Sequence, residues 1–133
     1  MKKIAALLFA LLMPVAALAD PSADATNAAK AWLALVDQGN YAKSWSESSS
    51  LMQAGISQDG WTNAAKPVHE NLGAVVSREP AGVEMMKSLP GAPDGQYAIV
   101  HFKTRFEKKA DGEETVTMMM DRGKWKAAGY FIK

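Results

Sequence analysis

Apolar residues change their spacing near the middle of the chain. Over residues 22–36 and again over residues 61–72 they recur every three to four positions, which is the spacing of one face of an α-helix. Ser57 precedes the second stretch as a helix cap, and Gly73 follows it, as glycine often does beyond a helix end. Two amphipathic helices are therefore predicted in the first half of the chain.

Shorter helical segments are predicted around them. Ser22 or Asp24 provides the cap of the first helix. Asn40 is placed to cap a short helix over residues 41–45, and residues 51–52 fit a further helical turn. The first half is thus helical, with polar breaks between its segments.

Beyond Gly73 the pattern becomes extended. Pro80, the Pro-Gly-Ala-Pro-Asp-Gly segment at 90–95 and the Asp-Arg-Gly segment at 121–123 are typical of strand ends and turns. Short connections of this kind join antiparallel neighbours. The sequence therefore predicts an antiparallel β-meander of about four or five strands, at residues 74–78, 83–89, 96–106, 114–120 and 125–132.

Helices followed by an antiparallel sheet define the α+β class. The sheet must bury its more apolar face against the helices, and Trp32, Trp45 and Trp61 all lie in the helical half. We expect these tryptophans to fill the space between the two layers. Residues 20–133 contain no repeat or linker pattern and are expected to form a single domain.

Residues 1–19 have the pattern of a secretory signal peptide. Lys2 and Lys3 precede an apolar run, and small residues lead up to Ala19. The apolar core is too short for a membrane-spanning helix. We predict cleavage between Ala19 and Asp20, and a periplasmic or secreted mature protein. Mass spectrometry of the purified protein tests the prediction, and an intact N-terminus would contradict it.

Composition excludes several classes of function. The chain of 133 residues has no cysteine, which excludes disulfides, thiolate metal sites and a cysteine nucleophile. Loss of Lys2 and Lys3 with the signal peptide leaves 13 basic and 14 acidic residues. The mature chain therefore lacks the excess of basic residues that is typical of nucleic-acid-binding proteins. No membrane span is expected in the mature protein.

Several segments resemble a family of small secreted bacterial proteins known only as a domain of unknown function. They are Trp-Leu-Ala-Leu-Val-Asp at 32–37, Ser-Leu-Pro-Gly-Ala-Pro-Asp-Gly-Gln-Tyr at 88–97 and Trp-Lys-Ala-Ala-Gly-Tyr at 125–130. This resemblance implies no assigned activity and no functional residues. The order of helices and strands is also similar to the cone-shaped fold of nuclear transport factor 2 and of cystatin.

The sequence contains no recognised catalytic, cofactor-binding or metal motif. His69 and His101 are far apart in sequence and lack the spacing of a metal pair. Methionine sulfur is a soft ligand suited to Cu(I), but Met118 and Met120 share a strand face with Val116 and are expected in the core. We therefore expect no cofactor.

Three functions remain open. The first is a role as an interaction or accessory protein, as a homodimer or with a periplasmic partner. The second is binding of a small ligand between helices and sheet. The third is an isomerase-like or dehydratase-like enzyme in the same pocket, which needs a buried base and an oxyanion donor. Candidates for these two groups are Asp37, Glu70, Tyr41, Tyr97 and Tyr130.

The interaction role depends on the outer face of the sheet. If Val100, Phe102 and Met118 point to the helices, alternation places their neighbours on the opposite face. On the last strand, the charged residues Lys124 and Lys126 indicate that the even-numbered side chains point outward. Ala128, Tyr130 and Ile132 would then lie on the same outer face. The resulting apolar surface is a possible interface, formed by Tyr97, Ile99, His101, Met119 and Tyr130.

Overall fold

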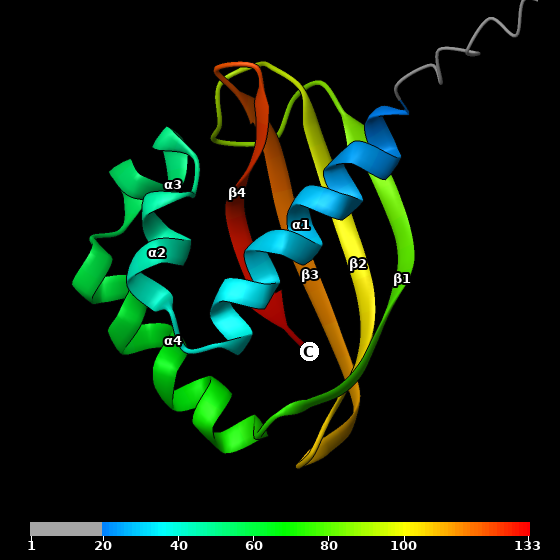
Figure 1. The fold of residues 1–133 in the computed structure, drawn as a ribbon. Helices are drawn as coiled ribbons and strands as arrows, with labels where there is room; N and C mark the ends of the chain where they lie inside the picture. Colours follow the sequence, from blue (N-terminus) through cyan, green and yellow to red (C-terminus); the bar gives the residue numbers. More distant parts are fainter. Residues whose placement is uncertain (1–19) are drawn as a thin grey trace, which may run out of the picture.

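A computed structural model describes residues 20–133, in which four helices are followed by a four-stranded sheet (Figure 1). The α+β prediction is confirmed. The strands pair antiparallel in the order β1-β2-β3-β4, which is a meander. The elements are α1 (Pro21–Asp37), α2 (Tyr41–Ser46), α3 (Ser50–Gly55), α4 (Gln58–Leu72), β1 (Val75–Met86), β2 (Tyr97–Phe106), β3 (Lys109–Asp121) and β4 (Lys124–Ile132).

The predicted signal peptide and Ala19 lie outside the described residues. Asp20 is the first described residue and caps α1, with its carboxylate accepting a hydrogen bond from the Ser22 amide at 3.1 Å. The cap therefore lies before Ser22 and Asp24, and Pro21 takes the first helical position, where its missing N–H costs nothing. Within residues 20–133, no helix combines the length and apolar character that crossing a bilayer requires.

The remaining helix ends follow the local sequence. Asn40 and Ser57 cap α2 and α4 as predicted, and Ser49 caps α3. Gly73 ends α4 with a φ of 77°, a conformation that a side chain would strain. The chain then reverses from α4 into β1 at this glycine.

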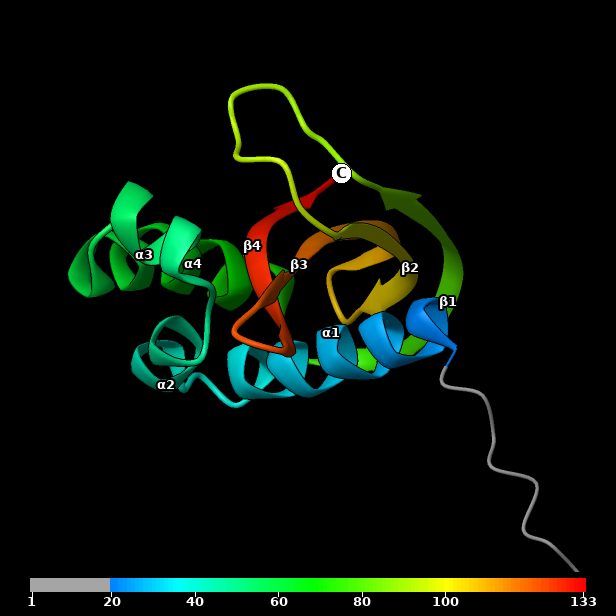
Figure 2. The ribbon, with the colours of Figure 1, turned by 90° about the horizontal axis from the view of Figure 1, so that it is seen from above.

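The sheet curls, and α1 lies across its inner face (Figures 1 and 2). α2, α3 and α4 gather beside α1 at the β4 edge of the sheet, and α1 contacts all four strands. Trp32 and Trp61 are buried between the layers, as expected, and Trp45 packs against them from a half-buried position. The core is therefore formed by one face of α1, by α4 and by the inner face of β2 and β3.

β1 differs from the prediction. Two strands were expected on either side of Pro80, but the structure has one strand through it. β1 is an edge strand, so a proline there need not interrupt the ladder. The pairing of β1 with β2 shifts by one residue between Pro80 and Gly82, which leaves Ala81 without a partner on β2.

The predicted orientation of β4 is correct at its start and wrong at its end. Lys124 and Lys126 lie on the outer face, but a register shift opposite Thr117 and Met118 leaves Ala128 as an extra residue. A bulge of this kind reverses which side chains point inward. Tyr130 consequently pairs with Val116 on the inner face, and Ile132 follows it, contrary to the prediction.

Candidate functional site

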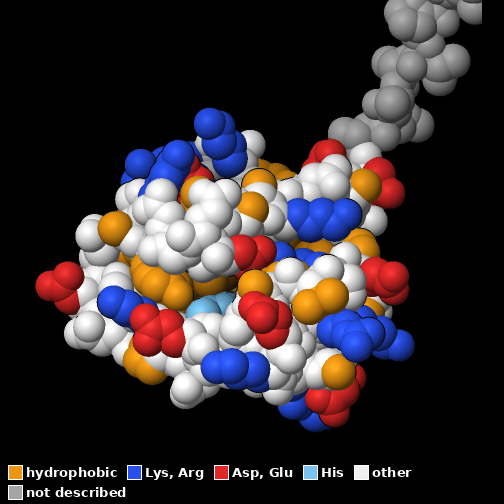
Figure 3. Space-filling view, turned by 60° about the horizontal axis from the view of Figure 1, so that its bottom comes forward, with side chains coloured by type: hydrophobic (Ala, Val, Ile, Leu, Met, Phe, Trp, Pro, Cys, Tyr) orange, Lys and Arg blue, Asp and Glu red, His pale blue; other side chains and the backbone are white. Residues whose placement is uncertain are grey.

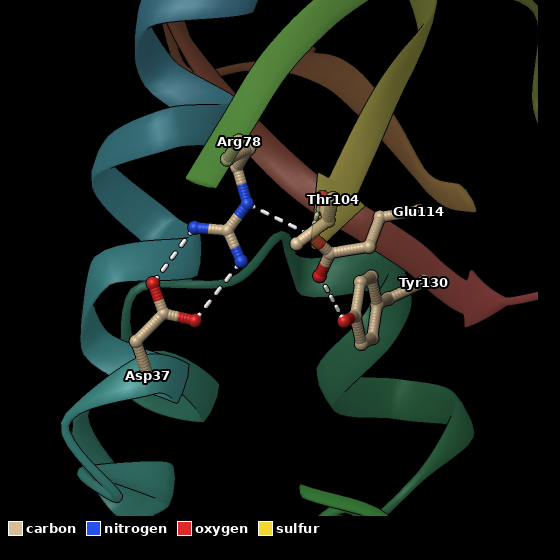
Figure 4. Close-up of polar contacts among 5 residues, drawn as sticks. All are labelled: Asp37, Arg78, Thr104, Glu114 and Tyr130. Atoms are coloured by element: carbon tan, nitrogen blue, oxygen red, sulfur yellow. Dashed lines mark hydrogen bonds and ion pairs between the residues drawn. The ribbon is translucent and has the colours of Figure 1, made fainter. Parts of the chain in front are cut away.

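An ion-pair cluster links α1 to the inner face of the sheet. Arg78 extends from β1 and donates two hydrogen bonds to the Asp37 carboxylate at the end of α1, at 2.7 and 3.0 Å. Its Nε donates to Glu114 of β3 at 2.7 Å. Figure 4 shows the guanidinium between the two carboxylates. Every guanidinium nitrogen of Arg78 is therefore engaged with a carboxylate.

Glu114 is the centre of this cluster. Its side chain is fully buried and accepts hydrogen bonds from Arg78, from Thr104 Oγ1 at 2.5 Å and from the Tyr130 hydroxyl (Figure 4). Next to it, Gly112 allows β3 to approach β2 closely, because a Cβ there would lie 2.7 Å from the Thr104 carbonyl oxygen. A buried carboxylate is tolerated only with such a set of partners.

The cluster fixes the charges of its members. Burial raises the pKa of Tyr130, and the neighbouring Glu114 carboxylate raises it further, so the hydroxyl remains protonated and donates to Glu114. Burial alone would lower the pKa of Arg78, but the hydrogen bonds and charges of Asp37 and Glu114 reverse that effect and raise it. Arg78 therefore remains a cation.

His69 lies next to the cluster, in the last turn of α4. Its ring stacks on Tyr130, with centroids 5.9 Å apart and an angle of 15° between the planes. Tyr41 and Phe106 lie at centroid distances of 6.4 and 6.5 Å. Burial lowers the pKa of His69, although the nearby Glu114 and Asp37 carboxylates oppose that shift. The ring is accordingly neutral at neutral pH.

One ring nitrogen of His69 has no partner. Nε2 is the single buried side-chain nitrogen or oxygen in residues 20–133 that lacks a hydrogen bond. Buried polar atoms are almost always paired, so this nitrogen is an exception within the described part of the chain. Because the atom has almost no accessible surface, a new partner would require a small movement of the side chains around it.

Two cavities meet at His69. The first cavity, which we call the mouth, lies where α1 and α4 end and has a volume of about 410 Å³. Its lining includes Asp37, Tyr41, Lys66, His69 and Glu70. Figure 3 shows a hollow on this side of the molecule, with hydrophobic and histidine side chains at its floor and acidic side chains near its rim. The mouth thus combines charged groups with aromatic rings.

The second cavity, the slot, lies between α4 and β4. It has a volume of about 240 Å³. Its lining consists of Trp61, Ala64, Ala65, Val68, His69, Tyr130, Phe131 and Ile132. Apart from His69 and the Tyr130 hydroxyl these side chains are apolar or aromatic, which is the composition typical of small-molecule sites.

The structure brings together some of the residues expected for a pocket. Asp37, Tyr41, Glu70 and Tyr130 surround the two cavities. Tyr97 lines neither cavity. It is the first residue of β2, at the end of the strand away from Thr104, and its hydroxyl donates to the Pro93 carbonyl at 2.5 Å. Four of the five residues named for a pocket therefore lie around these cavities, and Tyr97 does not.

Three members of the site were not among the candidates predicted from the sequence. His69 was considered only as a metal ligand and was set aside because of its spacing from His101, and Arg78 and Glu114 were not candidates. Glu114 had a detectable signal, because it shares its strand parity with Val116 and Met118, which were expected in the core. A carboxylate at an inward position requires a buried partner, and a search for one would have pointed to an arginine.

The predicted outer-face interface is wrong at both tyrosines. Tyr97 is fully buried, and the segment between β1 and β2 covers it, while Tyr130 faces the helices. Ile99, His101 and Met119 lie on the outer face and are half-buried. His101 contacts Thr115 Oγ1 at 3.2 Å and Glu84 at 3.6 Å, which makes this face more polar than expected.

Tyr130 is poorly placed for acid–base chemistry. The Tyr130 hydroxyl is committed to Glu114, and its raised pKa makes its anion harder to form. In residues 20–133, no three His, Asp or Glu side chains are placed to hold a metal ion. Met118 is buried in the core at 1% exposure, consistent with a packing role.

Comparison with known protein families places the chain in a family. The model of a family described as "Protein of unknown function (DUF4019)" matches residues 28–130, which includes every residue of the ion-pair cluster, the mouth and the slot except Phe131 and Ile132. No curated protein matches the chain.

Proposed function

The chain belongs to the DUF4019 family, and we propose that it is an exported protein that binds a small, largely apolar molecule between α4 and β4. The observation that carries the proposal is the largely apolar and aromatic lining of the slot, with His69 shared between the slot and the mouth. A polar group of a bound molecule would lie beside His69. Its apolar part would cover the walls of the slot.

The composition of the two cavities supports this function. Apolar walls provide the favourable burial, and a few polar groups orient the ligand. The neutral ring of His69 presents one donor or acceptor to a ligand, depending on its tautomer. Trp61 and Tyr130 are held in place by hydrogen bonds to Ser44 and Glu114, so the walls are already ordered. Such preorganisation lowers the entropy cost of binding.

Export remains part of the proposal because the pattern of residues 1–19 supports it. The role as an interaction protein has less support, since two of the five residues expected at its interface lie inside the fold. Binding of a small molecule requires no such surface. The cavity is therefore the feature to test first.

A neutral aromatic probe provides the test. We expect indole, titrated into the purified protein in the millimolar range, to shift the amide NMR signals of α4 and β4 in a saturable way. Ala64→Phe should abolish these shifts, because Ala64 is exposed on α4 and lines the slot, so that a phenyl ring would fill it.

The matched control is Ala42→Phe. Ala42 is exposed on α2 and lines none of the cavities found in residues 20–133. This variant should bind indole as the unmodified protein does. The proposal would be contradicted by a protein that shows no saturable shifts, or by equal binding in the two phenylalanine variants.

A further inference from the structure

We propose that the ligand carries a positive charge, and that the mouth selects organic ammonium groups over carboxylates and phosphates. This inference rests on the proposed function, because it names the class of molecule that enters the same site. The ammonium group would lie in the mouth beside His69, and the apolar body would extend towards the slot. Two features argue for this class: the balance of charge and the aromatic rings.

The charges around the mouth favour a cation. Asp37, Glu70 and Lys66 line the mouth, and behind them Arg78 pairs with both Asp37 and Glu114. Together these three carboxylates and two cations leave an excess of one negative charge while His69 is neutral. A ligand cation would balance this charge, whereas a ligand anion would add to it in a partly dehydrated place where charges interact more strongly than in water.

Arg78 is a poor anion receptor. Three of its five N–H groups already donate to the Asp37 and Glu114 carboxylates, and the negative charge of these two neighbours opposes a further anion. Its side chain is only 12% exposed. Lys66 is exposed at the rim, as is Glu70 one turn further along α4, so water screens both of these charges and each offsets the other.

Aromatic rings supply the second feature. Tyr41 and His69 both line the mouth, and their ring centroids are 6.4 Å apart. The faces of aromatic rings attract cations, and this attraction combines with nearby carboxylates in sites that recognise ammonium groups. The Asp37 and Glu70 carboxylates lie in the same lining. The mouth thus offers both kinds of contact that an ammonium group requires.

Protonation of His69 would oppose such a ligand. Burial lowers the pKa of His69, so the ring is neutral at pH 7 and gains a proton only in more acidic solution. That proton would cancel the excess negative charge of the mouth. The groups facing or flanking the ring are Asp37 from α1, Tyr41 from α2, Lys66 and Glu70 from α4, Arg78 from β1, Glu114 from β3 and Tyr130 from β4.

Three probes that share one ring separate charge from apolar contact. Benzylammonium, benzyl alcohol and benzoate are titrated into the protein under the same conditions, with binding followed by calorimetry and amide NMR shifts. We expect benzylammonium to bind about tenfold or more tightly than benzoate at low salt, with benzyl alcohol between them. The shifts should centre on the mouth. Benzylammonium binding should weaken as pH falls from about 7 to 5 and should lose this dependence in His69→Gln.

Glu70→Gln and Glu79→Gln make the matched pair. Both glutamates are exposed and each change removes one negative charge, but Glu70 lines the mouth and Glu79 lies on the outer face of β1. Only Glu70→Gln should weaken benzylammonium binding, by about threefold to tenfold. Equal effects of the two changes would show that general charge attraction explains the binding, and would overturn the inference.

Indole, measured in the same samples, separates the two proposals. If indole binds in the slot but benzylammonium binds no better than benzoate, the cation preference is wrong and the proposed function stands. If neither indole nor any charged probe binds, the proposed function fails, and the cation preference fails with it.

Discussion

Replacing Arg78 by methionine is expected to lower the free energy of unfolding by about 3–5 kcal/mol. The reason is the carboxylate that it leaves behind: Glu114 is fully buried, and Arg78 is the one cation that pairs with it in residues 20–133. Thr104 and Tyr130 would still donate to Glu114, but neither carries a positive charge. Chemical denaturation of the two proteins, followed by circular dichroism, measures the difference.

Arg105→Met is the matched control. Arg105 is exposed on β2 and points to the outer face, so the same chemical change should alter the free energy of unfolding by less than about 0.5 kcal/mol. Adding Glu114→Gln to Arg78→Met should recover part of the loss, because the buried charge is then removed together with its partner. Equal losses for Arg78 and Arg105 would contradict the importance of the cluster.

Replacing Trp61 by alanine is expected to lower the free energy of unfolding by about 3–5 kcal/mol. Trp61 is buried between α4 and the inner face of the sheet, with its ring centroid 5.6 Å from that of Trp32 and 6.4 Å from that of Tyr130. Alanine would leave a cavity among rings that hold one another in position. Thermal and chemical denaturation both report the loss.

Trp61→Phe separates packing from hydrogen bonding. Phenylalanine keeps an aromatic ring but loses the bond from the indole nitrogen to Ser44 Oγ, which is 2.9 Å long. We expect this variant to lose roughly 1–2 kcal/mol, much less than alanine. A loss below about 1 kcal/mol for Trp61→Ala would mean that the side chain does not fill the space between the layers.

The two predicted losses are linked through Tyr130. Its ring contacts Trp61 and its hydroxyl donates to Glu114, so it joins the tryptophan core to the ion-pair cluster. The ring of His69 stacks on Tyr130 as well. The energy that keeps the slot in shape is therefore provided both by the tryptophan core and by the ion-pair cluster.

Helices and turns of this protein were predictable because their signals are local. The caps at Asn40 and Ser57, the glycine at 73 and the turn at 121–123 act within a few residues of their own position. The spacing of apolar residues separated helix from strand for the same reason. The outcome was an α+β fold with a meander, which the structure confirms.

Where the structure departs from the prediction, the cause is the neighbouring strand. Pro80 remains within β1 because that strand is at the edge of the sheet, and edge position is a property of the assembled sheet. The extra residue Ala128 reverses the inward and outward positions of β4, and a single bulge has no reliable signal in sequence. Tyr130 was therefore assigned to the wrong face.

Signals between residues close together in the chain were enough to predict the fold class, the caps of α2 and α4 and most of the inward positions of β2 and β3. The site depends on contacts between distant parts of the chain. Arg78 is 41 residues from Asp37 and 36 from Glu114, and His69 meets Tyr130 only after the β4 bulge has turned the tyrosine inward. Charge pairing and cavity shape depend on distances in space, and nothing in the spacing of these residues along the chain encodes those distances.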